Sequence, residues 1–264
     1  PRHGGRLRLK SPIIIVGLGE LGQLLAAAFL RSGHPVYPIT RSNTWDDLPP
    51  DLPAPGLVVI AVGETDLDAV LSGLPDRFRD RVLLLQNELL PPDWHLHGIM
   101  DPTVIVVWLD KKRGRPAVSV LPNRVAGPAS DWVVTALNGI DVPTNKIPEE
   151  DLVPSLVAKN LYILTINIMG LKVGGTVGEL WTKHRALTES VAEEILSIQF
   201  RRLGYELDRR RLMDDLLEGF AGDLNHICMG RSAPKRLARA LEEASKFEVK
   251  VPHLRQIAQR AGLQ

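Results

Sequence analysis

The sequence predicts an α/β protein in two parts, a doubly wound sheet followed by an all-helical C-terminal domain. Short β-branched runs alternate with helix-forming segments up to residue 147, which is typical of a mostly parallel sheet. A glycine-rich turn joins the first of these runs to the first helix-forming segment. From residue 152 onward long amphipathic stretches replace the strand pattern, so we expect helices there.

Composition and charge fit a folded globular protein and exclude several kinds of partner. At about 150 residues per domain, the 264 residues leave room for one or two domains. The shares of hydrophobic (44%) and charged residues (24%) argue against disorder. The 32 basic and 31 acidic residues give a net charge of +1 without a basic half, so we expect neither nucleic acid nor an anionic membrane as partner.

Three further signals concern the compartment. The single cysteine, Cys228, cannot form an internal disulfide, which fits the cytoplasm. The uncharged run at residues 160–171 contains three polar side chains and is too short to span a bilayer. Residues 1–11 carry four basic residues before an apolar run, but that run ends in glycines instead of a cleavage site, so we interpret these residues as a tail.

The first predicted strand and helix enclose a G-x-G-x-x-G motif. Residues 12–16 form a β-branched run that suits a buried parallel strand, and residues 21–31 favour a helix. Between them, Gly17 allows a tight turn, Gly19 lets the backbone approach a pyrophosphate, and Gly22 permits close packing of helix on strand. The free N–H groups at the helix N-terminus attract phosphates.

This motif alone can serve any strand-to-helix turn, but its context favours dinucleotide binding. A second strand is predicted at residues 35–40, so strand, motif, helix and strand follow in the order of a Rossmann domain. We therefore predict that the glycines bind the cofactor together with their neighbours Leu18, Glu20 and Leu21.

The end of the second predicted strand indicates which dinucleotide is bound. An acidic residue there would bind the ribose 2′-hydroxyl of NAD, but this sequence has Arg41 and Ser42. A guanidinium and a hydroxyl suit a 2′-phosphate, which favours NADP(H). Asp46 and Asp47 lie further on, where they start or cap the next turn. A solvated surface arginine is the alternative interpretation of Arg41.

Four more strands are predicted, with a helix at residues 66–74 between the first two: residues 57–62, 82–86, 104–109 and 117–121. Ligands of doubly wound sheets bind beyond the carboxyl ends of the strands, which adds Val62 and Gly63 to the predicted cofactor site. Asn87 follows the next strand, and its amide suits the orientation of a nicotinamide or a substrate oxygen. An asparagine at this place is also an ordinary turn residue.

Two segments receive a structural interpretation. His95 and His97 have the spacing of two ligands on one face of a strand, but no nearby set of cysteines or carboxylates completes a zinc site, so we expect no metal. The charged stretch at residues 110–116, with Gly114, is interpreted as the tip of a hairpin.

The first predicted helix of the C-terminal domain is very apolar but contains Lys159, Asn160 and Asn167. At about 100° per residue, Lys159 and Asn167 lie about 80° apart and the two asparagines about 20° apart. Polar groups on one side of a buried helix are costly unless they line a cleft or are fully hydrogen-bonded. The sequence leaves both explanations open.

These residues resemble the ketopantoate reductases, within the larger group of 6-phosphogluconate-dehydrogenase-like two-domain enzymes. The glycine motif with Arg41 is similar to that family's NADPH site, and LLLQNEL is similar to its strand ending in asparagine-glycine. Lys159 and Asn167 look like its K-x7-N helix, and VGEL at residues 177–180 is similar to its N-G-E-L stretch. The resemblance covers nearly the whole chain from Pro12. It implies reduction of a 2-keto group by NADPH, with the lysine protonating the alkoxide while asparagines hold the substrate.

Four positions depart from the family pattern. Gly63 stands where the family usually has a lysine, and Ile163 where it has an asparagine. A count back from the Val251-Pro252 stretch puts Ser232 where the family has a substrate-binding glutamate. Glu88 replaces a glycine, and its charge near the cofactor is expected to repel an anionic keto acid. The cofactor half therefore matches better than the substrate half.

The leading hypothesis is an NADP(H)-dependent oxidoreductase with a Rossmann domain at residues 12–147 and a helical substrate and dimerisation domain at residues 148–264. We expect the site in the cleft between the domains, with Lys159 as proton donor and Asn87 and Asn167 orienting a small carbonyl compound. One alternative is a catalytically degenerate protein that binds NADP(H) as a structural ligand or sensor and acts through partners. Another is a reductase for an imine or a 3-hydroxy acid. The hypothesis is compatible with a cytoplasmic homodimer.

Overall fold

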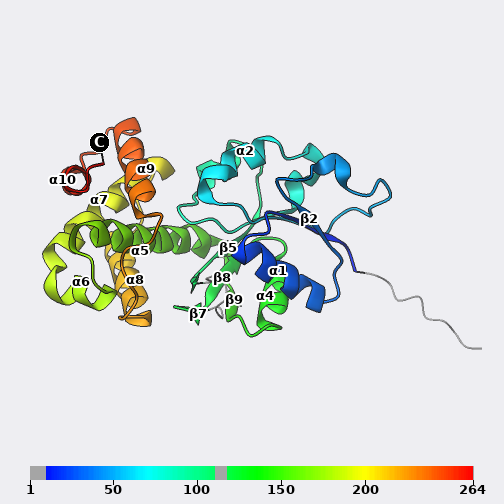
Figure 1. Cartoon of the computed structure of the whole chain (residues 1–264), viewed down its shortest axis with the longest axis horizontal. Helices are drawn as coiled ribbons and strands as arrows, with labels where there is room; N and C mark the ends of the chain where they lie inside the picture. The colour runs from blue at the N-terminus through cyan, green and yellow to red at the C-terminus, as the bar shows by residue number, and fades with distance from the viewer. Residues whose placement is uncertain (1–9, 111–117, 264) are drawn as a thin grey trace, which may run out of the picture. The chain divides into compact units, whose positions relative to one another are not determined.

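The computed structural model describes residues 10–110 and 118–263, which divide into two compact units (Figure 1). The first unit comprises the described residues up to Gln86 and Asp93–Leu152. The second comprises Asn87–Pro92 and the chain from Val153 onward, so a short segment between two parts of the first unit packs with the helices. Residues 1–9 of the tail predicted at 1–11 and residues 111–116 of the hairpin tip predicted at 110–116 lie outside the described residues.

The first unit is built on a seven-stranded sheet in the order β2-β1-β3-β4-β5-β8-β9. Its strands are β1(Ile13–Val16), β2(Val36–Ile39), β3(Leu57–Ile60), β4(Val82–Leu84), β5(Thr103–Val106), β8(Asn123–Ala126) and β9(Thr144–Lys146). The pairs from β2 to β5 are parallel, β8 is antiparallel to β5, and β9 is parallel to β8. Every residue of β1, β3, β4 and β5 is buried, as in strands covered on both faces.

Helices cover both faces of this sheet (Figure 1). Helices α1(Glu20–Arg31) and α4(Ser130–Asn138) lie on one face, where Leu25, Phe29 and Val133 join the core formed with the strands. Helix α2(Leu67–Ser72) lies over the other face. Short helical segments fill the connections: η1(Trp45–Asp47), η2(Glu64–Asp66), η3(Asp76–Arg81), α3(Pro91–His95) and η4(Glu149–Asp151).

Several elements at the far edge of the sheet differ from the prediction. Strand β8 was not predicted because it begins with polar residues. The first of them, Asn123, is buried, and both atoms of its side-chain amide have hydrogen-bond partners. Its Oδ1 accepts from the Trp108 N–H at 2.8 Å, and its Nδ2 donates to the Pro143 carbonyl at 3.2 Å. The single strand predicted at residues 104–109 is wrong, because β5 ends at Val106 and β6(Leu109–Asp110) pairs with β7(Val118–Ser119) in a separate ribbon.

The described part of the second unit is helical apart from an isolated bridge between Thr176 and Ile227. Its helices are α5(Leu152–Val173), α6(Val177–Lys183), α7(Arg185–Leu203), α8(Arg209–Gly222), α9(Ala233–Lys246) and α10(Pro252–Arg260). Buried Glu194 of α7 accepts hydrogen bonds from the backbone N–H groups of His253 and Leu254 and so caps the first turn of α10. The predicted fold class, a Rossmann sheet followed by a helical domain, is confirmed.

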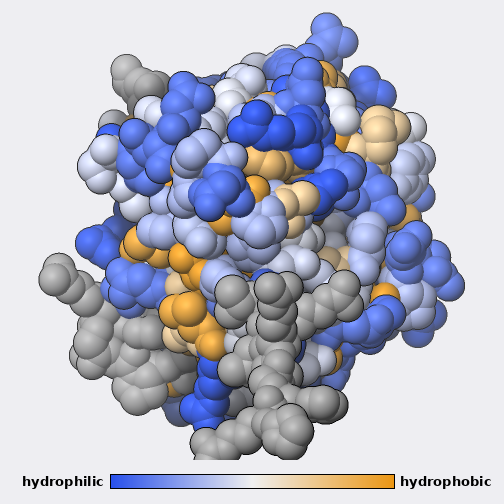
Figure 2. Space-filling model, turned by 90° about the vertical axis from the view of Figure 1, so that its right-hand side faces the viewer, coloured by the Kyte–Doolittle hydropathy of each residue, from blue (hydrophilic) through white to orange (hydrophobic). Residues whose placement is uncertain are grey.

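One helical stretch of the described residues, Glu149–Val173, has the length and composition to cross a membrane. The share of its most apolar window that is buried inside the protein is 72%, which is the burial of a core helix. Tyr162 on this helix packs on Phe220 of α8, with ring centroids 6.1 Å apart. The surface that faces the viewer in Figure 2 carries mostly hydrophilic side chains, with smaller groups of hydrophobic ones between them.

Candidate functional site

The first unit contains a cavity of about 910 Å³ at the carboxyl ends of β1, β2 and β3. From β1 the chain moves to β2 on one side and then crosses to β3 on the other side of β1. The carboxyl end of β1 is therefore the topological switch point, where doubly wound sheets bind ligands. The volume of the cavity lies in the range of cofactor sites, roughly 300–1,000 Å³. Seven of the predicted cofactor residues line it: Gly17, Leu18, Gly19, Arg41, Ser42, Val62 and Gly63.

The three glycines of the motif differ in why a side chain is excluded or tolerated at each position. Gly17 has φ 92°, and a Cβ on it would lie 2.7 Å from the Ala61 carbonyl oxygen. A Cβ on Gly22 would overlap the Gly17 carbonyl oxygen. No described atom lies within 4 Å of a Cβ built on Gly19, which lines the cavity. The turn itself therefore requires Gly17 and Gly22, whereas Gly19 keeps the cavity open.

The other predicted residues of the motif start α1 and are absent from the described lining of the cavity. Glu20, Leu21 and Gly22 belong to the first turn of that helix. The Leu21 side chain packs against the hydrophobic core. What these residues offer to a ligand is the backbone N–H groups of a helix N-terminus.

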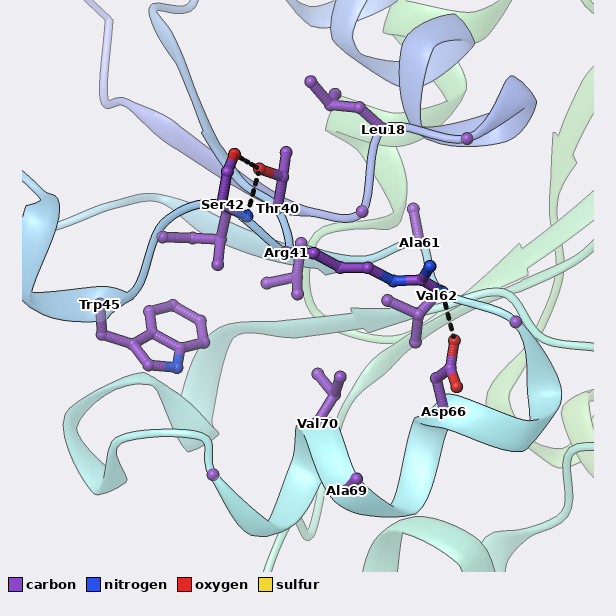
Figure 3. A pocket seen from close by; sticks show the side chains of 16 residues that line it. Leu18, Thr40, Arg41, Ser42, Trp45, Ala61, Val62, Asp66, Ala69 and Val70 are labelled. Atoms are coloured by element: carbon purple, nitrogen blue, oxygen red, sulfur yellow. Dashed lines mark hydrogen bonds and ion pairs between the residues drawn. The ribbon is translucent and has the colours of Figure 1, made fainter.

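Hydroxyl groups and a guanidinium gather after β2, at one end of the cavity (Figure 3). Thr40 Oγ1 and Ser42 Oγ are 2.8 Å apart. Asn43 Oδ1 holds this turn by accepting from the Thr40 N–H at 2.7 Å. The Arg41 side chain is 97% exposed, and its Nη2 lies 3.7 Å from Oδ2 of Asp66. This arrangement presents hydrogen-bond donors and one positive charge to a ligand.

Sequence reasoning missed the apolar wall of the cavity. Trp45, in η1, and Val70, on α2, both line it (Figure 3). The indole of Trp45 is supported by buried Phe78, with ring centroids 5.5 Å apart. A flat aromatic wall suits a planar ring such as a purine. The available signal was a tryptophan a few residues beyond a strand that ends at a predicted binding edge.

The predicted catalytic side chains belong to the second unit. Lys159 is half-buried, and its Nζ lies 5.4 Å from the centre of the Tyr162 ring, within cation–π range. Buried Asn160 donates from Nδ2 to the Leu89 carbonyl at 3.1 Å. Buried Asn167 accepts at Oδ1 from Nη1 of Arg236 at 3.1 Å. Hydrogen bonding thus accounts for part of the polarity of α5. Asn87 is half-buried in the same unit.

The carboxylate of Glu88, which was expected to place a negative charge near the cofactor, is paired with arginines. The residue has φ 64°, the left-handed region that glycine prefers. Its carboxylate accepts from Nε of Arg236 at 3.1 Å and from Nε of Arg239 at 2.9 Å. Its carbonyl accepts from Nη1 of Arg202 at 3.2 Å. The negative charge expected to repel an anionic substrate is therefore balanced by two arginines.

Arg236 was not predicted, although the pattern of α9 contains a signal for it. The buried residues of this helix recur every three or four positions, and the arginine stands among them: Ala233, Arg236, Leu237, Ala240 and Ala244. A charged residue in an apolar stripe needs a buried partner. Ser232, at the N-cap of the same helix, is exposed. The described α9 thus presents a guanidinium to Asn167, one turn beyond Ser232.

Two other predicted features have structural roles. Glu179 of the VGEL stretch forms a capping box with Thr176, whose N–H donates to Glu179 Oε2 at 3.0 Å. The strand interpretation of the two histidines is wrong, because His95 ends α3 and His97 follows in a turn, 3.1 Å from Asp68 Oδ1. Residues 10–110 and 118–263 contain no group of three histidines, cysteines or carboxylates that could hold a metal ion.

The chain thus combines a doubly wound sheet, which has a cavity at its switch point, with a helical unit, and solved structures share this architecture. A 2-dehydropantoate 2-reductase from Methylococcus capsulatus has a TM-score of 0.70 and 12% identity, over 96% of each chain. A dimeric ketopantoate reductase from Staphylococcus aureus has a TM-score of 0.61 and 16% identity, over 95% of this chain and 97% of that chain. A D-mandelate dehydrogenase solved with NADH has a TM-score of 0.66 and 14% identity, over 95% and 97%.

The fold is thus that of the ketopantoate reductases, as the resemblance of the sequence implied. No protein-family model matches the chain, and comparison with curated protein sequences finds no significant match.

Proposed function

We propose that the protein is an NADP(H)-dependent oxidoreductase that reduces a 2-keto acid or a similar small carbonyl compound. The observation that carries this proposal is the cavity at the switch point, with Gly17 and Gly19 in one wall and Arg41 and Ser42 in another. Structures of the same fold named as 2-dehydropantoate 2-reductases and as a D-mandelate dehydrogenase support the reaction class. A nicotinamide cofactor, when bound, supplies the hydride.

The residues of the cavity fit this cofactor. The open space at Gly19 suits a pyrophosphate close to the backbone, and Trp45 and Val70 offer apolar walls to the adenine. The Arg41 guanidinium and the Ser42 hydroxyl suit a 2′-phosphate, which makes NADP(H) the preferred form.

We propose Lys159 as the group that protonates the carbonyl oxygen, with Asn87 and Asn167 orienting the substrate. A charged ammonium stabilises negative charge that develops on oxygen. Because Asn167 Oδ1 accepts from Arg236, its amide N–H groups are the end that remains suited to a substrate oxygen. Lys159 belongs to the second unit and the cavity to the first.

The test is NADPH oxidation across a panel of 2-keto acids, imines and other carbonyl compounds, together with NADPH binding. We expect turnover of at least one 2-keto acid, and Lys159→Ala should abolish most of it while leaving NADPH affinity nearly unchanged. The matched control is Lys250→Ala, which removes one positive charge, as Lys159→Ala does, but at an exposed position. Arg239→Ala is unsuitable as a control because Arg239 holds the Glu88 carboxylate. An alanine variant at Lys159 with normal turnover would contradict the catalytic proposal.

The alternative is a protein that binds NADP(H) as a structural ligand or sensor. It is favoured by Gly63, Ile163 and exposed Ser232, where the family's substrate residues are missing. NADPH binding without turnover of any compound in the panel would support it, and absence of NADPH binding would refute both proposals.

We also propose a cytoplasmic location and a homodimer. The buried, unpaired thiol of Cys228 fits a reducing compartment, and a ketopantoate reductase of the same fold is dimeric. Light scattering during size-exclusion chromatography tests the assembly, and a monomer at micromolar concentration would contradict it.

A further inference from the structure

Asp66 is the acidic residue among the described residues that line the nucleotide cavity. Its Oδ2 lies 3.7 Å from Nη2 of Arg41, the residue proposed to bind the 2′-phosphate. Figure 3 shows the Arg41 side chain extending from the end of β2 toward this carboxylate. The two side chains are 53% and 97% exposed, so they form a pair that a ligand can reach and separate.

Asp66 stands where two helical segments meet. It is the last residue of η2 and directly precedes α2, and its own backbone is helical, with φ −99° and ψ −8°. Its side chain makes no cap hydrogen bond within the described structure. The position of Asp66 therefore leaves its carboxylate beside the Arg41 guanidinium at the edge of the cavity.

We propose that Asp66 is a second determinant of cofactor choice, which competes with the 2′-phosphate for Arg41 and so limits the preference for NADP(H). This inference rests on the proposed function. The carboxylate and the phosphate are both negative, so they repel each other when they approach one guanidinium. The ribose diol of NAD(H) carries no charge and does not enter this competition. Asp66 therefore weakens the binding of 2′-phosphorylated nucleotides selectively.

The experiment compares two adenine nucleotides that differ in the 2′-phosphate. 2′,5′-ADP and 5′-AMP are titrated calorimetrically into the full chain, as wild type, Asp66→Asn, Arg41→Ala and the double variant. Asp66→Asn should bind 2′,5′-ADP about two- to fivefold more tightly, with less than about a 1.5-fold change for 5′-AMP. The gain should shrink in the Arg41→Ala background, and it should also shrink at high salt. Asp51→Asn is the matched control, because Asp51 is exposed and lies outside the described cavity lining.

Each other outcome has a separate meaning. Unchanged binding of 2′,5′-ADP by Asp66→Asn, with wild type still preferring it to 5′-AMP, would overturn this inference and leave the proposed cofactor intact. Weaker binding of both nucleotides by Asp66→Asn would make Asp66 a ligand of the adenosine part and would also overturn the inference. If wild type binds neither nucleotide, the proposed function fails and the inference fails with it.

Discussion

The side-chain oxygen of Asn167 accepts a hydrogen bond from Nη1 of Arg236 at 3.1 Å, and both residues are buried. The same guanidinium donates from Nε to the Glu88 carboxylate at 3.1 Å. A buried guanidinium is tolerated because a carboxylate balances its charge, and removal of that partner leaves the cost of desolvation uncompensated. The orientation of Asn167 therefore depends on Glu88, a residue of the segment Asn87–Pro92.

A pair of glycine substitutions separates the contribution of this ion pair from that of backbone strain. Glu88 and Glu248 both have left-handed backbones, with φ 64° and 56°. At exposed Glu248, glycine should raise the free energy of unfolding by about 0.5–1 kcal/mol. Glu88→Gly relieves similar strain but leaves Arg236 and Arg239 without their carboxylate, so it should lower that free energy by about 2–4 kcal/mol. Urea denaturation followed by circular dichroism measures both, and stabilisation by Glu88→Gly would show that strain outweighs the ion pairs.

Two alanine substitutions in the glycine motif should have opposite consequences. Gly22→Ala forces a Cβ against the Gly17 carbonyl and should lower the free energy of unfolding by about 1–3 kcal/mol. Gly19→Ala meets no described atom within 4 Å, so stability should change by less than about 1 kcal/mol. The added methyl group enters the cavity, however, and should weaken NADPH binding. Thermal unfolding and fluorescence titration check the two variants, and normal NADPH affinity in a folded Gly19→Ala would place the pyrophosphate elsewhere.

Arg41→Ala should remove the preference for the phosphorylated cofactor. Loss of one charge-assisted contact costs about 1.5–3 kcal/mol, or roughly ten- to a hundredfold in NADPH affinity, with a small effect on NADH. Calorimetric titration of wild type and variant with both cofactors measures the change. Equal affinities for NADH and NADPH in wild type would contradict the assignment made from Arg41 and Ser42.

The thiol of Cys228 should make stability depend on pH in the alkaline range. Burial, aided by the charge of Glu179, raises the pKa of this thiol from 9.0 to about 11. The folded protein therefore holds the proton more tightly than the unfolded chain does. The resulting stabilisation is complete below about pH 9 and is lost as the pH rises through about 11, and it amounts to roughly 2–3 kcal/mol.

Comparison of wild type with Cys228→Ala isolates this contribution from that of lysines and tyrosines. Unfolding free energies from urea titrations at several alkaline pH values should fall less steeply in the variant. Parallel pH profiles would mean that the thiol ionises as easily in the folded protein as in the unfolded chain.

The parts of the molecule that the sequence predicted are those determined by local residues. Gly17, Gly19 and Gly22 lie within six positions of one another, and their turn follows from the steric limits of the chain. The pair of Glu88 and Arg236 is separated by 148 positions, and no local pattern links its members. The same holds for Arg41, which follows β2, and Asp66, which follows β3: they meet because both strands are parallel neighbours of β1. The glycine turn could therefore be predicted from the sequence, and the charge partners could not.

The last prediction is that ketopantoate is a poor substrate, although the fold is that of the ketopantoate reductases. This 2-keto-4-hydroxy acid presents a carboxylate, a ketone and a hydroxyl, and each missing buried partner costs about 1–3 kcal/mol. Gly63, Ile163 and exposed Ser232 lack the expected groups, whereas Glu88 is paired with arginines and adds no free charge. With partial additivity, three losses cost about 3–6 kcal/mol and lower kcat/KM a hundred- to ten-thousandfold. Steady-state NADPH oxidation measures this constant. The control substrates are 2-keto acids without the hydroxyl group, because they lose fewer contacts than ketopantoate when the expected partners are missing. A kcat/KM for ketopantoate above about 10⁴ M⁻¹s⁻¹ would show that other residues, with Arg236 the first to test, replace the missing partners.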